Sequence, residues 1–175
     1  MLARDELREA FLVRAELESL ATEIATPKMS SADLAALEEA ERLFSAATRE
    51  LVEMSHAGRQ DLQLARKWLH ANHAFHDVIY VAAAVPLIER MAKAARRTFL
   101  VKPVWATGAD LDELYSTNDR QHRAIREAIA ARSPQGARVL AREHVLSSGR
   151  LLEAILDKVA SQTREPAPPP LSYMS

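Results

Sequence analysis

The stretch DLQLARKWLHANHAFHDVIYVAAAVP, residues 61–86, decides the fold class of this chain. Before Pro86 it contains neither glycine nor proline, and its apolar residues recur every three or four positions, as on one face of an α-helix. This apolar stripe consists of Leu62, Ala65, Trp68, Leu69, Ile79 and Ala83. The segment therefore predicts a helix from about Asp61 to Ala84, which ends there because proline cannot continue the helical hydrogen bonds.

Five further helices are predicted from the same spacing and from their boundary residues. They span approximately residues 5–25, 32–55, 87–101, 110–132 and 134–160. Ser30 and Asp33 have the spacing of a capping box, and Ser133-Pro134 is typical of a helix start. No strand-like alternation is visible in the sequence. We therefore expect an all-α, antiparallel bundle of about six helices over residues 1–161, followed by a disordered, proline-rich tail over residues 162–175.

The composition of the chain excludes several classes of protein. With 175 residues, 48% of them hydrophobic, the chain fits one ordinary domain. It has no cysteine, which excludes disulfides and thiolate metal sites. No apolar run approaches the roughly 20 residues that a membrane-spanning helix needs. The first residues, MLARDELREA, carry charges where a signal peptide would be apolar, so we expect a cytoplasmic protein.

The charge of the chain gives no sign of a nucleic-acid surface. It has 23 basic and 24 acidic residues, interspersed, for a net charge of -1. Proteins that bind DNA usually carry a basic excess or a basic face. Lys93, Arg96 and Arg97 form a small basic cluster, which we interpret as a solvated helix face. These 175 residues are not expected to bind DNA by themselves.

Polar side chains interrupt the apolar stripes of four predicted helices. They are Arg14 in the first helix, Asn72 and His76 in the third, Asn118 and His122 in the fifth, and His144 and Ser148 in the last. The apolar stripe of the last helix includes Leu140. A buried polar group without a partner costs on the order of 1–3 kcal/mol, so these groups must satisfy one another. A metal ion would do so, because imidazole is the commonest ligand of divalent transition metals.

Other interpretations of single residues remain open from the sequence. One core histidine is more often structural than a metal ligand, and His70 and His73 lie at the edge of their stripe or outside it. Arg14 either clamps a carboxylate or extends its charged end to solvent. Glu53 and His56 form a Glu-x-x-His pair, but only once and opposite the apolar stripe, which indicates a surface pair.

The order of the motifs resembles a known family. The segments EAFLVRAELESLATEIAT, SSADLAALEEAERLF, ANHAFHDVIY and QHRAIREAIAARSPQGARVLAREHV, within about Asp5 to Ala160, are similar to the FCD domain. This is the C-terminal effector-binding domain of FadR-like GntR transcriptional regulators. The resemblance implies an all-helical bundle that binds a divalent metal through an Asp-x-x-x-His pair and two later histidines, with a small organic acid beside it.

Carried onto this sequence, the family's metal ligands fall on Asn72, His76, His122 and His144. Asn72 departs from the family's aspartate, and its neutral oxygen is expected to weaken metal binding or abolish it. In the family a winged helix-turn-helix domain precedes this region and contacts DNA, so DNA binding is expected only through a domain that these residues do not contain.

The leading hypothesis is therefore a ligand-sensing domain of a transcriptional regulator, expected to be a homodimer and not an enzyme. It would bind zinc or nickel and a small carboxylate effector, with Arg14, Asn118 and Ser148 contacting the effector. One alternative is a metal-dependent hydrolase or lyase, which needs a general base near the metal. We find no inward-facing carboxylate in the sequence, which disfavours that alternative. The other is a metal-free helical dimerisation module.

Overall fold

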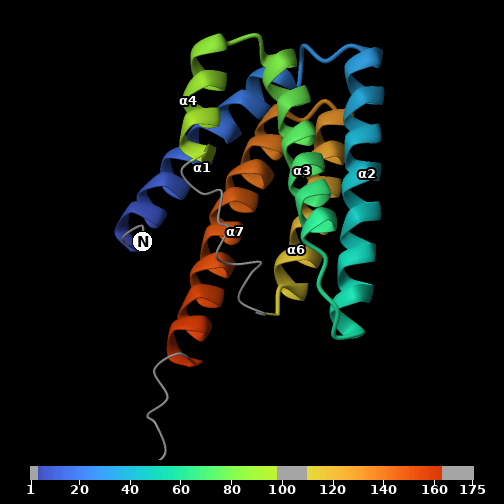
Figure 1. Ribbon diagram of the computed structural model, residues 1–175. Helices are drawn as coiled ribbons and strands as arrows, with labels where there is room; N and C mark the ends of the chain where they lie inside the picture. The colour runs from blue at the N-terminus through green and yellow to red at the C-terminus, as the bar shows by residue number, and fades with distance from the viewer. Residues whose placement is uncertain (1–3, 98–109, 163–175) are drawn as a thin grey trace, which may run out of the picture.

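The computed structural model describes residues 4–97 and 110–162 (Figure 1). This part of the chain contains helices and no strand, which confirms the all-α prediction. The helices are α1 (Arg4–Ala25), α2 (Ser31–His56), α3 (Leu62–Ala83), α4 (Pro86–Arg97), α6 (Asp112–Ala130) and α7 (Pro134–Gln162).

The helix boundaries follow the local signals in the sequence. The Ser30 hydroxyl accepts from the backbone N–H of Asp33 at 3.1 Å, and the Asp33 carboxylate accepts from that of Ser30 at 2.8 Å, so the capping box is confirmed. Pro134 opens α7, as expected for a proline at the first helical position. The predicted end of α4 at residue 101 lies outside the described residues. So does the predicted tail, except Gln162, which is the last residue of α7.

The helices pack as a bundle in which neighbours in sequence run antiparallel (Figure 1). Helix α7 lies along α1 and α6, and α2 lies along α3 and α6. The short α4 packs on α1. Gly149 allows α7 to approach α1 closely, because a Cβ at this position would lie 2.8 Å from Cγ of Phe11. No helix in the described part of the chain is long and apolar enough to span a membrane.

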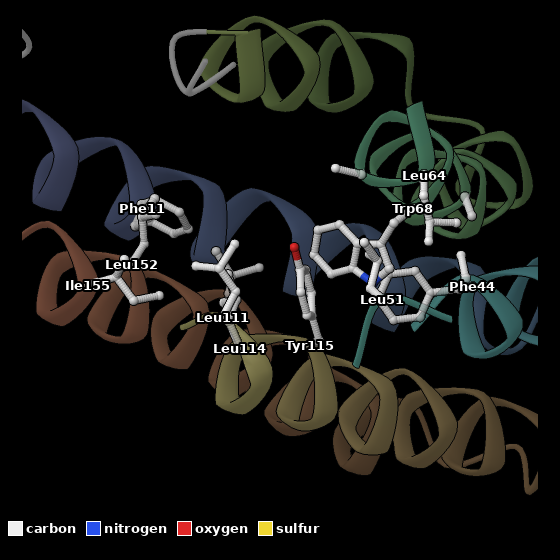
Figure 2. Packing of buried hydrophobic residues seen from close by; sticks show 14 of the residues in the cluster. Phe11, Phe44, Leu51, Leu64, Trp68, Leu111, Leu114, Tyr115, Leu152 and Ile155 are labelled. Atoms are coloured by element: carbon white, nitrogen blue, oxygen red, sulfur yellow. The ribbon is translucent and has the colours of Figure 1, made fainter. Parts of the chain in front are cut away.

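The core consists of two clusters of buried apolar side chains. One contains Phe11, Phe44, Trp68 and Tyr115, and Figure 2 shows these aromatic rings along the inside of the bundle. The other is built around Phe75, with members that include Ile79, Tyr80, Ile125 and Ile129. The ring of His122 packs 4.4 Å from that of Phe44 and 4.2 Å from that of Phe75. His122 therefore lies where the two clusters meet.

Three residues do not lie where the sequence predicted. Leu62 is 55% exposed and Leu140 is 38% exposed, although both were placed in apolar stripes. Leu62 is the first residue of α3, and it lines the surface cavity between the end of α2 and the start of α6. Arg96 is buried instead of solvated, because it donates to Asp77 and packs over the ring of Tyr80. The interpretation of a solvated basic cluster is therefore wrong for Arg96.

Candidate metal centre

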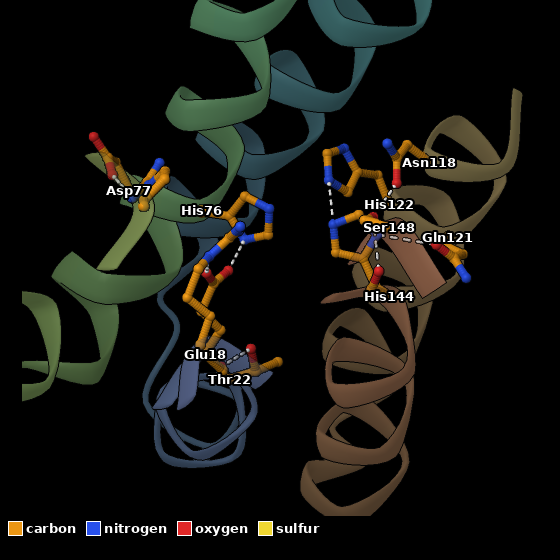
Figure 3. Close-up of polar contacts among 11 residues, drawn as sticks. Glu18, Thr22, His76, Asp77, Asn118, Gln121, His122, His144 and Ser148 are labelled. Carbon is orange, nitrogen blue, oxygen red and sulfur yellow. Dashed lines mark hydrogen bonds and ion pairs between the residues drawn. The ribbon is translucent and has the colours of Figure 1, made fainter. Parts of the chain in front are cut away.

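Three histidines from three helices meet in the core. His76 on α3, His122 on α6 and His144 on α7 are all buried, and one ring nitrogen of each lies within 4.8 Å of the others. Figure 3 shows the ring of His76 turned toward the His122–His144 pair. The periodicity argument predicted inward positions for all three, and the structure confirms them. Three buried histidines in this arrangement can coordinate a metal ion.

The spacing of the ring nitrogens fits metal coordination. The Nε2 atoms of His122 and His144 lie 3.2 Å apart. Two nitrogens that each lie about 2.0–2.1 Å from one zinc ion are separated by roughly 2.9–3.4 Å, depending on the coordination angle. Nε2 of His76 is buried and has no hydrogen-bond partner among the described residues. A metal ion would supply the partner that this nitrogen lacks.

Neighbouring side chains orient two of the rings for metal binding. Nδ1 of His144 lies 3.0 Å from Oε1 of Gln121, an oxygen that can only accept, so Nδ1 carries the proton and Nε2 the lone pair. Gln121 is itself held, since its amide nitrogen donates to the hydroxyl of Ser147 at 2.8 Å. On the other side of the site, Nδ1 of His76 lies 3.1 Å from Oε2 of Glu18, a charge contact in which Oε2 accepts no hydrogen bond among the described residues.

Burial keeps the three imidazoles neutral. It is the largest cause that lowers the pKa of His144 to about 4, and the charge of Arg14 lowers it further, against the opposing effect of Glu18. Burial and then the neighbouring His144 place the pKa values of His76 and His122 well below 6.5. Near pH 7 all three rings are therefore in the neutral form that binds metal.

A buried carboxylate borders this site, and the sequence analysis missed it. Glu18 on α1 is 2% exposed, and its Oε1 accepts from Nε of Arg14 at 2.8 Å. Glu41 is also buried and pairs with Arg126. The expectation that no carboxylate faces inward is therefore wrong. Arg14 is buried against Glu18, so the alternative that its charged end reaches solvent is also wrong.

The remaining predicted residues occupy positions around the cluster. Asn118 is buried, and its Oδ1 accepts from the hydroxyl of Ser148 at 2.6 Å, which links α6 to α7. Asn72 is half-buried and lies one helical turn before His76. None of the contacts in the structure tests these three residues as ligands of a metal or effector.

Other histidines lie outside the centre, as the sequence predicted. His70 and His73 line a surface cavity of about 460 Å³ between α3 and α4, together with Lys93 and Arg96. His56 is exposed and contacts Asp112 instead of Glu53, which agrees with a surface role. A second cavity of about 450 Å³ lies between the end of α2 and the start of α6, away from the three histidines.

A buried tyrosine close to Glu18 carries a further polar group of this region. The hydroxyl of Tyr80 on α3 has no hydrogen-bond partner among the described residues. Burial and the nearby Glu18 raise its pKa far above the usual value, so it stays protonated and can donate. Such a group is expected to have a partner, because leaving a buried donor unpaired costs about 1–3 kcal/mol.

Comparison with known families accounts for this combination of fold and site. The family model of the FCD domain matches residues 9–147, which is most of the chain. Among proteins with curated descriptions, none matches it. The helical bundle and the buried histidines are what the sequence resemblance implied. The chain therefore belongs to the FCD domain family, the ligand-sensing C-terminal domains of GntR-family regulators.

Proposed function

We propose that this domain senses a small organic acid, which binds beside a divalent transition metal in the core of the bundle and thereby signals to a transcriptional regulator. The observation that carries the proposal is the convergence of three buried, neutral imidazoles, with one Nε2 left without a partner. His76, His122 and His144 would hold the metal, and Asn72 would add its amide oxygen. This donor set favours zinc or nickel. A bound metal would offer its open positions to the acid.

The charge of the site supports an anionic effector. A divalent metal on neutral ligands brings two positive charges into the core, and the charge of Arg14 is already matched by Glu18. Buried charge without compensation is strongly unfavourable, so an anion that enters with the metal lowers the cost of both. A carboxylate would bind the metal, with Arg14, Asn118 and Ser148 as the proposed contacts for the rest of the molecule.

Glu18 does not make the site a good candidate for an enzyme. A general base must have a free oxygen within reach of the substrate proton. The two oxygens of Glu18 face Arg14 and His76 instead. The membership in a regulatory family also favours a sensor over the hydrolase or lyase alternative.

A homodimer is part of the proposal. Leu12 on α1, and Leu87 and Met91 on α4, are each about half exposed, and these two helices pack on each other. Large exposed apolar side chains on two helices that pack together support an interface at these helices. Contact with DNA would come only from a separate winged helix-turn-helix domain.

The joint site is tested by the thermal stability of the purified domain with small carboxylates, before and after removal of metal by a chelator. Bound ligand stabilises by RT ln(1 + [L]/Kd), which is about 2.7 kcal/mol when the ligand concentration is 100 times Kd. We expect di- or hydroxy-acids to raise the melting temperature only when zinc or nickel is present. An equal rise in the melting temperature of the chelated protein would mean that the acid binds independently of the metal. Turnover of an acid would favour the enzyme alternative.

Replacing Asn72 with aspartate is expected to tighten zinc binding by about tenfold or more, which is about 1.4 kcal/mol. The change keeps the size of the side chain and replaces a neutral oxygen with an anionic one beside a cation. Gln63→Glu is the matched control, because it adds the same charge to an exposed position of α3. Titration with a competing zinc chelator measures both variants. Unchanged or weaker affinity of Asn72→Asp would mean that Asn72 is not a ligand.

A further inference from the structure

Glu18 is the one carboxylate that contacts the histidine cluster directly in the described part of the chain, and its two oxygens face different partners. Oε1 accepts from Nε of Arg14, one turn earlier on α1, at 2.8 Å. Oε2 lies 3.1 Å from Nδ1 of His76, on the neighbouring helix α3. Figure 3 shows the Glu18 side chain reaching from α1 toward the ring of His76. The carboxylate thus bridges an arginine and a candidate metal ligand.

The contact with His76 favours one position of the ring proton. A carboxylate oxygen can only accept, so it favours the proton on Nδ1 and leaves the lone pair on Nε2. Nε2 is the His76 nitrogen without a partner. A carboxylate that holds the far side of a metal-binding imidazole orients the ring and raises its basicity, and loss of such a partner typically weakens metal binding by about 10–100-fold.

The contact with Arg14 determines which of its nitrogens remain available to bind an anion. Glu18 takes the Nε–H of the guanidinium, which lies over the ring of Phe11, and the two terminal nitrogens of Arg14 make no hydrogen bond among the described residues. Those nitrogens present the paired donors that match a carboxylate. The same side chain therefore places an anion-binding group and a metal-binding group in fixed relation to each other.

We propose that Glu18 is a positioning residue that couples metal binding to acid binding: one oxygen orients His76 for the metal, and the other orients Arg14 for the acid. The inference rests on the proposed function, since it assigns a role within that site. It has a measurable consequence, because coupling between two ligands is reciprocal. Metal must raise the affinity for the acid, and acid must raise the affinity for metal by the same factor.

The variant Glu18→Gln tests this role, because it keeps the shape of the side chain and changes what one of its two ends can do. The amide has one oxygen and one NH₂ group. If Arg14 keeps the oxygen, the NH₂ group faces Nδ1 of His76 and donates to it. The ring proton then moves to Nε2, which can no longer bind metal in that form. Glu16→Gln is the control, because Glu16 lies on the same helix but is exposed and pairs with Arg142.

The experiment titrates Co²⁺ by its visible absorption into the metal-free protein, with and without acetate. We expect Glu18→Gln to weaken Co²⁺ binding about 10–100-fold, and acetate to tighten Co²⁺ binding in the wild type but not in this variant. Glu16→Gln should behave as the wild type. If the wild type binds no Co²⁺, the proposed function fails and this inference with it. If the wild type binds Co²⁺ and Glu18→Gln retains the same affinity and coupling, the inference alone is overturned.

A second measurement needs no variant and no metal, so it applies even if Glu18→Gln does not fold. Nitrogen-15 NMR of the histidine rings reports which nitrogen carries the proton. In the metal-free wild type we expect the His76 proton on Nδ1. A proton on Nε2 of His76 would show that Glu18 does not orient the ring, and would overturn the inference while leaving the three-histidine site in place.

Discussion

Replacing Arg14 with methionine is expected to lower the free energy of unfolding by about 3–5 kcal/mol, because it leaves the carboxylate of Glu18 buried without its partner. Methionine fills a similar volume, so little of the loss would come from packing. The expected loss is a large part of the stability of an ordinary domain, which is about 5–15 kcal/mol. Urea denaturation of the metal-free protein measures it.

Two further variants decide the cause of that loss. The double variant Arg14→Met/Glu18→Gln removes both charges and should recover most of the stability, since an isosteric neutral pair has no uncompensated charge. Arg42→Met breaks the exposed pair with Glu39 on α2 and should change stability by less than about 1 kcal/mol. Similar small losses for Arg14→Met and Arg42→Met would contradict the buried ion pair.

This cost limits the use of Arg14→Met as a test of effector binding. A variant that unfolds readily binds any ligand weakly, whatever its contacts. Arg14→Lys retains the charge beside Glu18 but removes the paired donors of the guanidinium, so it is the sharper test of a carboxylate clamp.

Replacing either His122 or His144 with alanine is expected to weaken zinc or nickel binding by more than about 100-fold, which exceeds the effect of losing a group that only orients a ligand. Each substitution removes one of the three imidazoles that converge on the site. His56→Ala is the control, because His56 lies at the surface end of α2 and should leave metal binding unchanged.

The two variants should differ in stability even without metal. His122 is completely buried, with its ring stacked on Phe75 and close to Phe44, so alanine leaves a cavity between the two core clusters. Large-to-small changes of this kind cost about 2–5 kcal/mol. His144 lies less centrally in the core, so we expect His144→Ala to lower the free energy of unfolding by less than His122→Ala does. Metal affinity that persists in both variants would contradict their role as ligands.

Local sequence signals were enough to predict the helices and the three histidines. The capping box at Ser30 and the break at Pro86 act within a few residues, so they determine helix ends without reference to the rest of the fold. His76, His122 and His144 stood out because each interrupts an apolar stripe on its own helix. That argument needs only the helical period, and the structure confirms that all three are buried.

Pairing between helices was not visible in the sequence. Glu18, Glu41 and Arg96 were assigned to solvent or overlooked, because long charged side chains usually lie at the surface. In the structure their partners are Arg14 and His76, Arg126, and Asp77. Only Arg14 lies on the same helix as its partner, and its spacing of four residues from Glu18 was a signal that could have been used. The other pairs form only when the bundle assembles.

Elemental analysis of the domain, purified without a chelator, shows directly whether the three histidines hold a metal. We expect near-stoichiometric zinc or nickel in the wild type, and little metal in His122→Ala or His144→Ala. We also expect zinc added to the metal-free wild type to raise its melting temperature. A wild-type protein that contains no metal, and whose melting temperature does not change with added zinc or nickel, would contradict the metal centre and leave the histidines with a structural role only.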